Sequence, residues 1–117
     1  MKKLLLIMFL LFSTLAYSQE KETYVLDDVT ELITYTKTSI DGNLLELGKF
    51  TKSGKRTGTW KQYSANGELL VIAKFKAGRP HGLWRHWSDN KYAEITYING
   101  KRQSSKLVIE KNWLASN

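Results

Sequence analysis

The chain contains an internal repeat with a period of 24 residues. Trp60 and Trp84 are separated by this distance, and the residues around them match at the same offset. The matching pairs are Gly58 and Gly82, Tyr63 and Trp87, and Asn66 and Asn90. A repeat of this length is one small supersecondary unit, which buries its apolar face only when neighbouring units stack against it. The sequence therefore predicts a stack of similar units.

The repeated unit is expected to be a β-hairpin. Residues 32–97 show no helical periodicity and consist of strand-length runs separated by Gly, Asn and Asp. Paired strands are expected at residues 33–38 and 44–50, 58–63 and 69–75, and 83–87 and 92–97. The connecting turns fall at Asp41-Gly42, Asn66-Gly67 and Asp89-Asn90. Asn tolerates the left-handed conformation, so Asn90 is expected to complete the third turn. The predicted fold class is all-β.

The N-terminus has the features of a secretory signal peptide. Lys2 and Lys3 precede an apolar run at residues 4–15, and Ala16-Tyr17-Ser18 matches a small-x-small cleavage site. The apolar run is shorter than the roughly 20 residues that a membrane-spanning helix needs. We therefore expect removal of residues 1–18, no transmembrane segment in the mature form, and a periplasmic or extracellular location.

The remaining residues are expected to form one domain. An acidic leader at residues 19–31 precedes a repeat domain at residues 32–117. The predicted repeats and the C-terminal cap are residues 33–57, 58–81, 82–102 and 103–117. Within the cap, residues 107–114 fit either a strand or a short helix, and Trp113 is expected to cover the final hairpin.

Composition restricts how this domain is held together. The sequence has no cysteine, which excludes disulfides, thiolate metal sites, a catalytic thiol and a lipid-modified cysteine. A small exported domain without disulfides must rely on packing, here of aromatic side chains. The net charge is +7, and loss of Lys2 and Lys3 lowers it to +5. A basic surface favours anionic partners without identifying them.

The repeated pattern resembles a known family. Gly-x-Trp-x-x-Tyr-x-x-Asn-Gly, then an apolar strand ending in an aromatic residue and a short glycine turn, is similar to the MORN repeat. The resemblance is to the bacterial variant, whose members are often labelled YwqK-family antitoxins. It covers residues 58–82 well and residues 82–100 nearly as well, whereas residues 33–58 are degenerate.

The resemblance implies an elongated antiparallel meander of about three hairpins in a single twisted sheet, with no reaction and no cofactor. Members of the family serve as interaction modules, and eukaryotic relatives are linked to phospholipid head groups and to scaffolding. The antitoxin label implies binding of a partner toxin. Because the chain is expected to be exported, such a partner must be co-exported or extracellular.

The repeated aromatic residues are expected to form the core, because a single-layer sheet has few other ways to exclude water. The alternative is a concave aromatic platform that stacks sugar rings or peptide side chains. Trp84 and Trp87 are the best candidates for such a platform.

Basic residues follow each glycine that connects two hairpins. They are Lys55 and Arg56, Arg79, and Lys101 and Arg102. Stacked repeats would align these turns about 10 Å apart along one edge of the sheet. This spacing predicts a basic ridge that fits repeated anionic groups. The alternative is a row of solvated turns whose charges keep the sheet from aggregating.

Other polar residues give weaker signals. His81 and His86 have no neighbouring carboxylate at ligand spacing, so no metal site is expected. Asp27, Asp28 and Glu31 are interpreted as part of the acidic leader rather than as a cation site or a pair of catalytic carboxylates. The sequence has no catalytic-triad order, phosphate loop or zinc motif.

We therefore expect an exported, non-enzymatic binding module. The first hypothesis is a protein partner, and the second is an anionic surface of lipid head groups or polysaccharide. Nucleic acid is not expected as a partner. The candidate binding residues are Lys55, Arg56, Arg79, Lys101, Arg102, Trp84 and Trp87.

Overall fold

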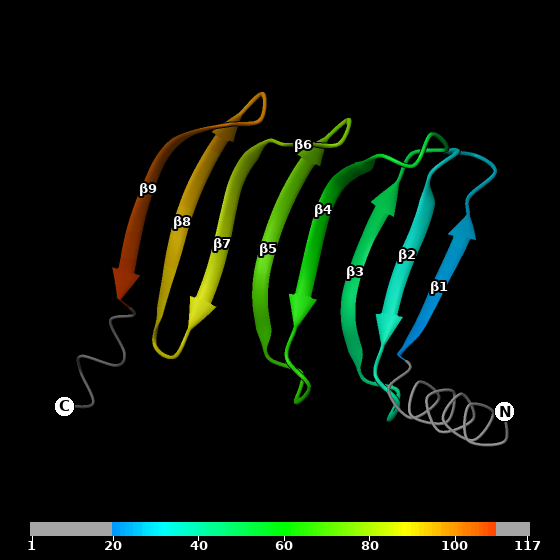
Figure 1. Cartoon of the computed structure of the whole chain (residues 1–117), viewed down its shortest axis with the longest axis horizontal. Coiled ribbons are helices and arrows are strands. Elements are labelled where there is room, and N and C mark those ends of the chain that lie inside the picture. Colours follow the sequence, from blue (N-terminus) through cyan, green and yellow to red (C-terminus); the bar gives the residue numbers. More distant parts are fainter. Residues whose placement is uncertain (1–19, 110–117) are drawn as a thin grey trace, which may run out of the picture.

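The computed structural model describes residues 20–109, which form one antiparallel sheet (Figure 1). The strands are β1 (Lys21–Leu26), β2 (Ile33–Thr38), β3 (Leu44–Phe50), β4 (Arg56–Tyr63), β5 (Leu69–Lys76), β6 (Arg79–Pro80), β7 (Gly82–Ser88), β8 (Lys91–Ile98) and β9 (Lys101–Ile109). Each strand pairs with the next along the chain, except that the short β6 lies off the main path and pairs only with β5. The predicted all-β meander of hairpins is confirmed for these residues.

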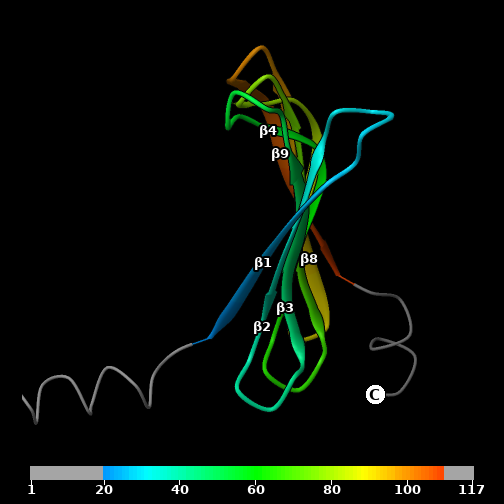
Figure 2. The same cartoon turned by 90° about the vertical axis from the view of Figure 1, so that its right-hand side faces the viewer.

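The sheet is a single twisted layer, which Figure 2 shows from its edge. The first predicted hairpin is confirmed residue for residue by β2 and β3. The second and third hairpins are formed by β4 with β5 and by β7 with β8. The predicted signal peptide and Trp113 lie outside the described residues.

The two end segments contribute more to the sheet than the sequence pattern indicates. Residues 19–31 were expected as a leader, yet β1 lies within them and pairs with β2 from Lys21↔Thr38 to Leu26↔Ile33. Residues 103–117 were expected as a cap, yet β9 runs through Ile109 and pairs with β8. Both strands are largely exposed. Backbone pairing with the neighbouring strand forms them, although neither has a regular alternation of apolar and polar residues in its sequence.

Three of the turns share one hydrogen-bonded structure. They span Ser39 to Asn43, Thr51 to Lys55 and Ser64 to Glu68. In each, the hydroxyl of the first residue accepts the backbone N–H of the fifth, at 3.1 Å. The fourth residue is a glycine with φ between 86° and 89°. A Ser or Thr three residues before the glycine is therefore part of the repeat.

Three further turns, Ala77-Gly78, Asp89-Asn90 and Asn99-Gly100, are two residues long. Ala77-Gly78 and Asn99-Gly100 have positive φ at both positions, which matches the twist of the flanking strands. In the Asp89-Asn90 turn, the positive φ belongs to Asp89, at 54°, and Asn90 is not among the residues with positive φ. The expected role of Asn90 is therefore wrong, because this shorter turn places its left-handed residue first.

The core is centred on Trp60, which is 2% exposed. Its indole lies flat on the backbone of Gly48 in the preceding strand, where an added Cβ would be 2.0 Å from the ring. Tyr35 stacks on the ring at 5.6 Å, and Phe50 meets it edge-on at 4.9 Å. The guanidinium of Arg56 covers it, 4.5 Å from the ring centroid. A single-layer sheet thus buries an indole completely by surrounding it with its neighbours.

The next repeat uses the same arrangement. The indole N–H of Trp60 donates to the carbonyl of Lys49 at 3.1 Å, and that of Trp84 donates to the carbonyl of Lys74 at 2.9 Å. Ala73 stands two residues before Phe75, as Gly48 stands before Phe50, and it is buried. Each tryptophan therefore reaches back to a small residue and a carbonyl of the preceding strand.

Substitution of the two residues at the centre of the core should give coupled losses of stability. Trp60→Ala should lower the free energy of unfolding by about 3 kcal/mol or more, because it removes a buried indole. Gly48→Ala should also be strongly destabilising, because its methyl group overlaps the ring. In the Trp60→Ala background, the Gly48→Ala change should cost much less. Denaturant melts of the double-mutant cycle measure this, and additive losses would contradict the packing.

Candidate binding surfaces

A continuous row of aromatic side chains crosses one face of the sheet. It consists of Tyr24, Tyr35, Phe50, Trp60, Phe75, Trp84 and Tyr97, one from each strand from β1 to β8 apart from β6. Neighbouring rings in the row have centroids between 4.9 and 6.3 Å apart. We call this side of the sheet the aromatic face.

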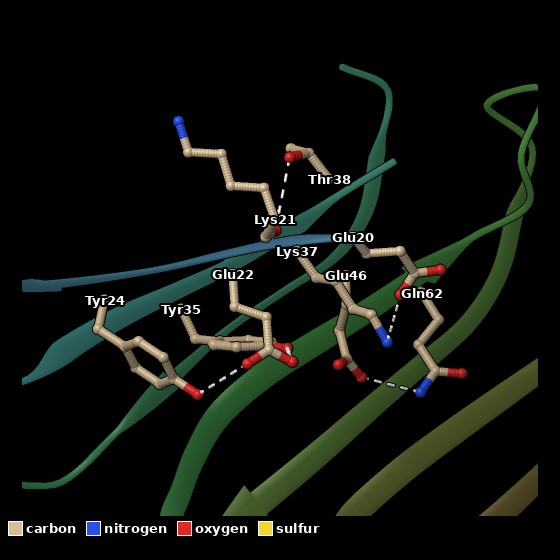
Figure 3. Close-up of polar contacts among 9 residues, drawn as sticks. All are labelled: Glu20, Lys21, Glu22, Tyr24, Tyr35, Lys37, Thr38, Glu46 and Gln62. Atoms are coloured by element: carbon tan, nitrogen blue, oxygen red, sulfur yellow. Dashed lines mark hydrogen bonds and ion pairs between the residues drawn. The ribbon is translucent and has the colours of Figure 1, made fainter. Parts of the chain in front are cut away.

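A row of polar side chains runs beside the aromatic row at the β1–β4 end (Figure 3). The registers Glu22↔Lys37, Lys37↔Glu46 and Glu46↔Gln62 place these four residues on the same face. Lys37 forms an ion pair with Glu20 at 2.8 Å, and Gln62 donates to Glu46 at 2.9 Å. Most of these polar groups are thus bonded to one another.

This polar row affects the ionisation of its neighbours. Burial, followed by the hydrogen bond that its hydroxyl donates to Glu22 at 3.2 Å, raises the pKa of Tyr35 to about 12. The hydrogen bond and charge of Glu20 raise the pKa of Lys37. Both effects keep the Tyr35 phenol and the Lys37 ammonium group protonated to higher pH than usual.

A shallow cleft of about 120 Å³ opens on the aromatic face between the two tryptophans. Its lining is Glu46, Arg56, Trp60, Gln62, Val71, Ala73, Phe75, Trp84 and His86. Arg56 lies over Trp60 and Phe75, and the imidazole of His86 stacks near Trp84 at 6.2 Å. Flat apolar walls beside a cation, a carboxylate and an amide suit a peptide side chain or a sugar ring.

The basic turns are stacked against one another in a row at one end of the strands. The N–H of Gly78 donates to the carbonyl of Arg56 at 2.9 Å, and that of Gly100 donates to the carbonyl of Pro80 at 3.0 Å. The side chain of Lys55 packs over Gly78, with its Cβ 3.5 Å from the position of an added Cβ. Arg79 packs in the same way over Gly100, at 3.8 Å. Lys55, Arg79 and Lys101, each directly after a turn glycine, form what we call the basic ridge.

The other two candidate arginines belong to the aromatic face rather than to the ridge. Arg56 is opposite Phe50 in the sheet register, and its guanidinium lies over Trp60. Arg102 is opposite Tyr97 and therefore shares its face. The strand alternation of side chains explains this, since Arg56 and Arg102 are one residue further along than Lys55 and Lys101.

The two candidate platform tryptophans lie on opposite faces, so they do not form one platform. They are three residues apart in β7, whose register with β8 is regular. Trp84 contacts Phe75 and Tyr97 on the aromatic face. Trp87 instead contacts Tyr92, at 5.7 Å. The cleft instead groups Trp84 with Trp60 and Phe75.

The face opposite the aromatic row is rich in basic residues, which was not predicted. The registers Lys61↔Ile72, Ile72↔Arg85, Arg85↔Glu94 and Glu94↔Lys106 place these side chains in one row. Glu94 bonds both Arg85 at 3.3 Å and Lys106 at 3.4 Å. Between residues 47 and 109 the chain has thirteen Lys and Arg and three acids. The alternation of side chains along each strand would have placed these residues on one face, but only if the register between the strands had been known.

The acidic residues of the β1–β2 loop have structural roles. Asp27 accepts the backbone N–H of Val29 at 2.8 Å, and this hydrogen bond lowers its pKa. Glu31 forms an exposed ion pair with Lys52 at 3.5 Å. In residues 20–109, no three His, Cys, Asp or Glu side chains gather as metal ligands. His81 lies between β6 and β7, with a buried Nδ1 that lacks a hydrogen-bond partner.

Within the same described part of the chain, no helix is long and apolar enough to cross a membrane. Comparison of the chain with protein-family models, with curated proteins and with solved structures finds no match. The resemblance to the MORN repeat therefore remains a hypothesis based on the sequence pattern.

The raised pKa of Tyr35 predicts a loss of stability at alkaline pH. An unfolded tyrosine ionises near pH 10, whereas folded Tyr35 keeps its proton up to about pH 12, so stability should fall between these values. The Tyr35→Phe variant should lack this part of the loss, which amounts to up to about 2 kcal/mol. Denaturant melts of both proteins from pH 8 to pH 12 measure the difference. Parallel pH profiles would contradict the burial of the phenol.

Proposed function

We propose that this chain is an exported, non-enzymatic binding module of the MORN-repeat variant type, and that it binds a protein partner through the aromatic face. The observation that carries the proposal is the cleft in which Trp84, Arg56 and His86 lie around the buried Trp60. Aromatic and arginine side chains are the groups that dominate the energy of protein interfaces.

The shape of the sheet also supports a protein partner. The cleft holds only about 120 Å³, and the aromatic row continues on both sides of it, from Tyr24 to Tyr97. A flat surface of this kind suits another protein surface better than a small molecule, which needs to be largely enclosed. In the periplasm or outside the cell, the partner is a co-exported or extracellular protein.

Capture of the partner from the envelope fraction tests this proposal. The exported protein serves as bait beside two variants, Trp84→Ala and Trp87→Ala, which remove the same side chain from opposite faces. Crosslinking should capture a protein with wild type and with Trp87→Ala, and recovery should fall at least tenfold with Trp84→Ala. Circular dichroism shows whether both variants are folded. Equal recovery with all three baits would exclude the aromatic face.

A second candidate function is binding of anionic surfaces, favoured by the basic ridge. Its turns are held in register by hydrogen bonds, so Lys55 and Arg79 lie at a fixed spacing at one end of the strands. The basic row on the opposite face adds to the same field. Charges gathered in this way attract phosphate or uronate groups, and salt screens the attraction over about 8 Å at physiological ionic strength.

Removal of the ridge charges separates the two candidate functions. Lys55→Gln/Arg79→Gln should weaken binding to vesicles with anionic lipids or to acidic polysaccharides several-fold at low salt. Lys21→Gln/Lys91→Gln, which removes the same charge from other parts of the sheet, should have a smaller effect. Both proteins should remain folded, because exposed charges contribute little to stability. Equal binding by the two variants would mean that the ridge is only a row of solvated turns and does not bind anionic surfaces.

A further inference from the structure

The sheet has two open edges, formed by its first and last strands. In residues 20–109, β1 pairs only with β2 and β9 pairs only with β8. An edge strand presents unpaired N–H and C=O groups that can pair with another chain. We propose that β9 of one copy pairs with β1 of the next, so that the protein forms an open head-to-tail assembly.

Exposed apolar side chains are concentrated on these two strands. Nine large apolar residues are exposed in the described structure, and five of them lie on β1 or β9. They are Tyr24, Val25, Leu26, Leu107 and Ile109, with exposures between 48% and 63%. Head-to-tail pairing would cover side chains that a single copy leaves in water.

The two edges carry opposite charge. β1 itself has one lysine and one glutamate, and the acidic charge at this edge comes from its flanks: Asp27 and Asp28 follow β1, and Glu20 and Glu31 are paired with Lys37 and Lys52 of the same chain. β9 has Lys101, Arg102 and Lys106 and no acid. Pairing of β1 with β1, or of β9 with β9, brings like charges together, whereas pairing of β9 with β1 brings opposite charges together. The charges therefore select the heterologous contact among the three possible ones.

The geometry of the sheet permits this contact to repeat. The main path has eight strands, each antiparallel to the next, so β1 and β9 run in opposite directions (Figure 1). A following copy in the same orientation then continues the antiparallel order. The β8–β9 turn and the β1–β2 loop lie at the same end of the strands, which brings Lys101 and Arg102 towards Asp27 and Asp28 of the next copy.

The side-chain faces also match. Tyr24 is opposite Tyr35 on the aromatic face, and Leu107 reaches that face through the registers with Ala93 and His86. Pairing β9 with β1 therefore extends the aromatic face from one copy to the next. Eight strands at about 4.8 Å give an advance of about 38 Å per copy. Because the sheet also twists, the contact does not close into a ring and produces a filament.

Sedimentation velocity of the exported protein over a wide range of concentrations tests the assembly. The average sedimentation coefficient should rise with concentration without stopping at a dimer, and high salt should weaken the association. Lys101→Glu/Arg102→Glu should weaken it at least tenfold. The control Lys55→Glu/Lys76→Glu, which changes the same charge away from β1 and β9, should change it less than twofold.

A mixing experiment shows which edges meet. The Asp28→Lys variant should associate more weakly than wild type by itself. Mixed with Lys101→Glu/Arg102→Glu, it should recover association, because the two changed edges are again opposite in charge.

A proline tests the role of the backbone. The N–H of Asp27 donates to Leu32, so by alternation the N–H of Leu26 points away from β2. Leu26→Pro removes this outward donor and should block assembly while the fold is kept, as checked by circular dichroism and tryptophan fluorescence. A monomer at all concentrations in low salt, a dimer of fixed size, or variants that assemble as wild type does would each overturn the proposal.

Discussion

The fold depends on the contact between the indole of Trp60 and the backbone of Gly48. A single-layer sheet has no second layer to cover its apolar side chains, so each must be covered by neighbours in the same layer. Trp60 achieves this because the strand beside it has no side chain at Gly48, which leaves room for the ring to lie flat. Tyr35, Phe50 and Arg56 then close around it. Burial of one large ring thus replaces the extended core of a two-layer domain.

The same contact arranges the surfaces that face solvent. With the ring flat, Phe50, Phe75 and Trp84 on the aromatic face remain partly accessible, and Trp84 borders a cleft while it packs against the core. The basic turns stack through hydrogen bonds between adjoining hairpins, from Gly78 to Arg56 and from Gly100 to Pro80.

The sequence predicted the hairpins well, because turn residues and the tryptophan repeat are local signals. It did not predict β1, and it offered a last strand only at residues 107–114 as one of two alternatives, whereas β9 begins at Lys101; both strands are ordered by backbone pairing with a neighbour. The small residues Gly48 and Ala73 were also missed, since nothing marks a residue whose function is to leave space. The sequence also assigned some candidate residues to the wrong face. Arg56 follows Lys55 directly, yet its side chain lies on the aromatic face and not in the basic ridge. The face of a residue follows from register, which a single sequence does not specify.

The contact between repeats has a direction. Each tryptophan bonds to a carbonyl of the strand before it, and nothing in the pattern requires a strand after it. Six residues after Gly100, where Trp60 and Trp84 follow Gly54 and Gly78, the chain has Lys106, and Ile95 replaces the small residue that the next indole would need. At these two positions the chain thus lacks both the tryptophan and the small residue of the contact between repeats. A copy of residues 58–81 inserted within the series would meet the same small residue and the same carbonyl on its N-terminal side, so the length of this architecture can change by whole repeats.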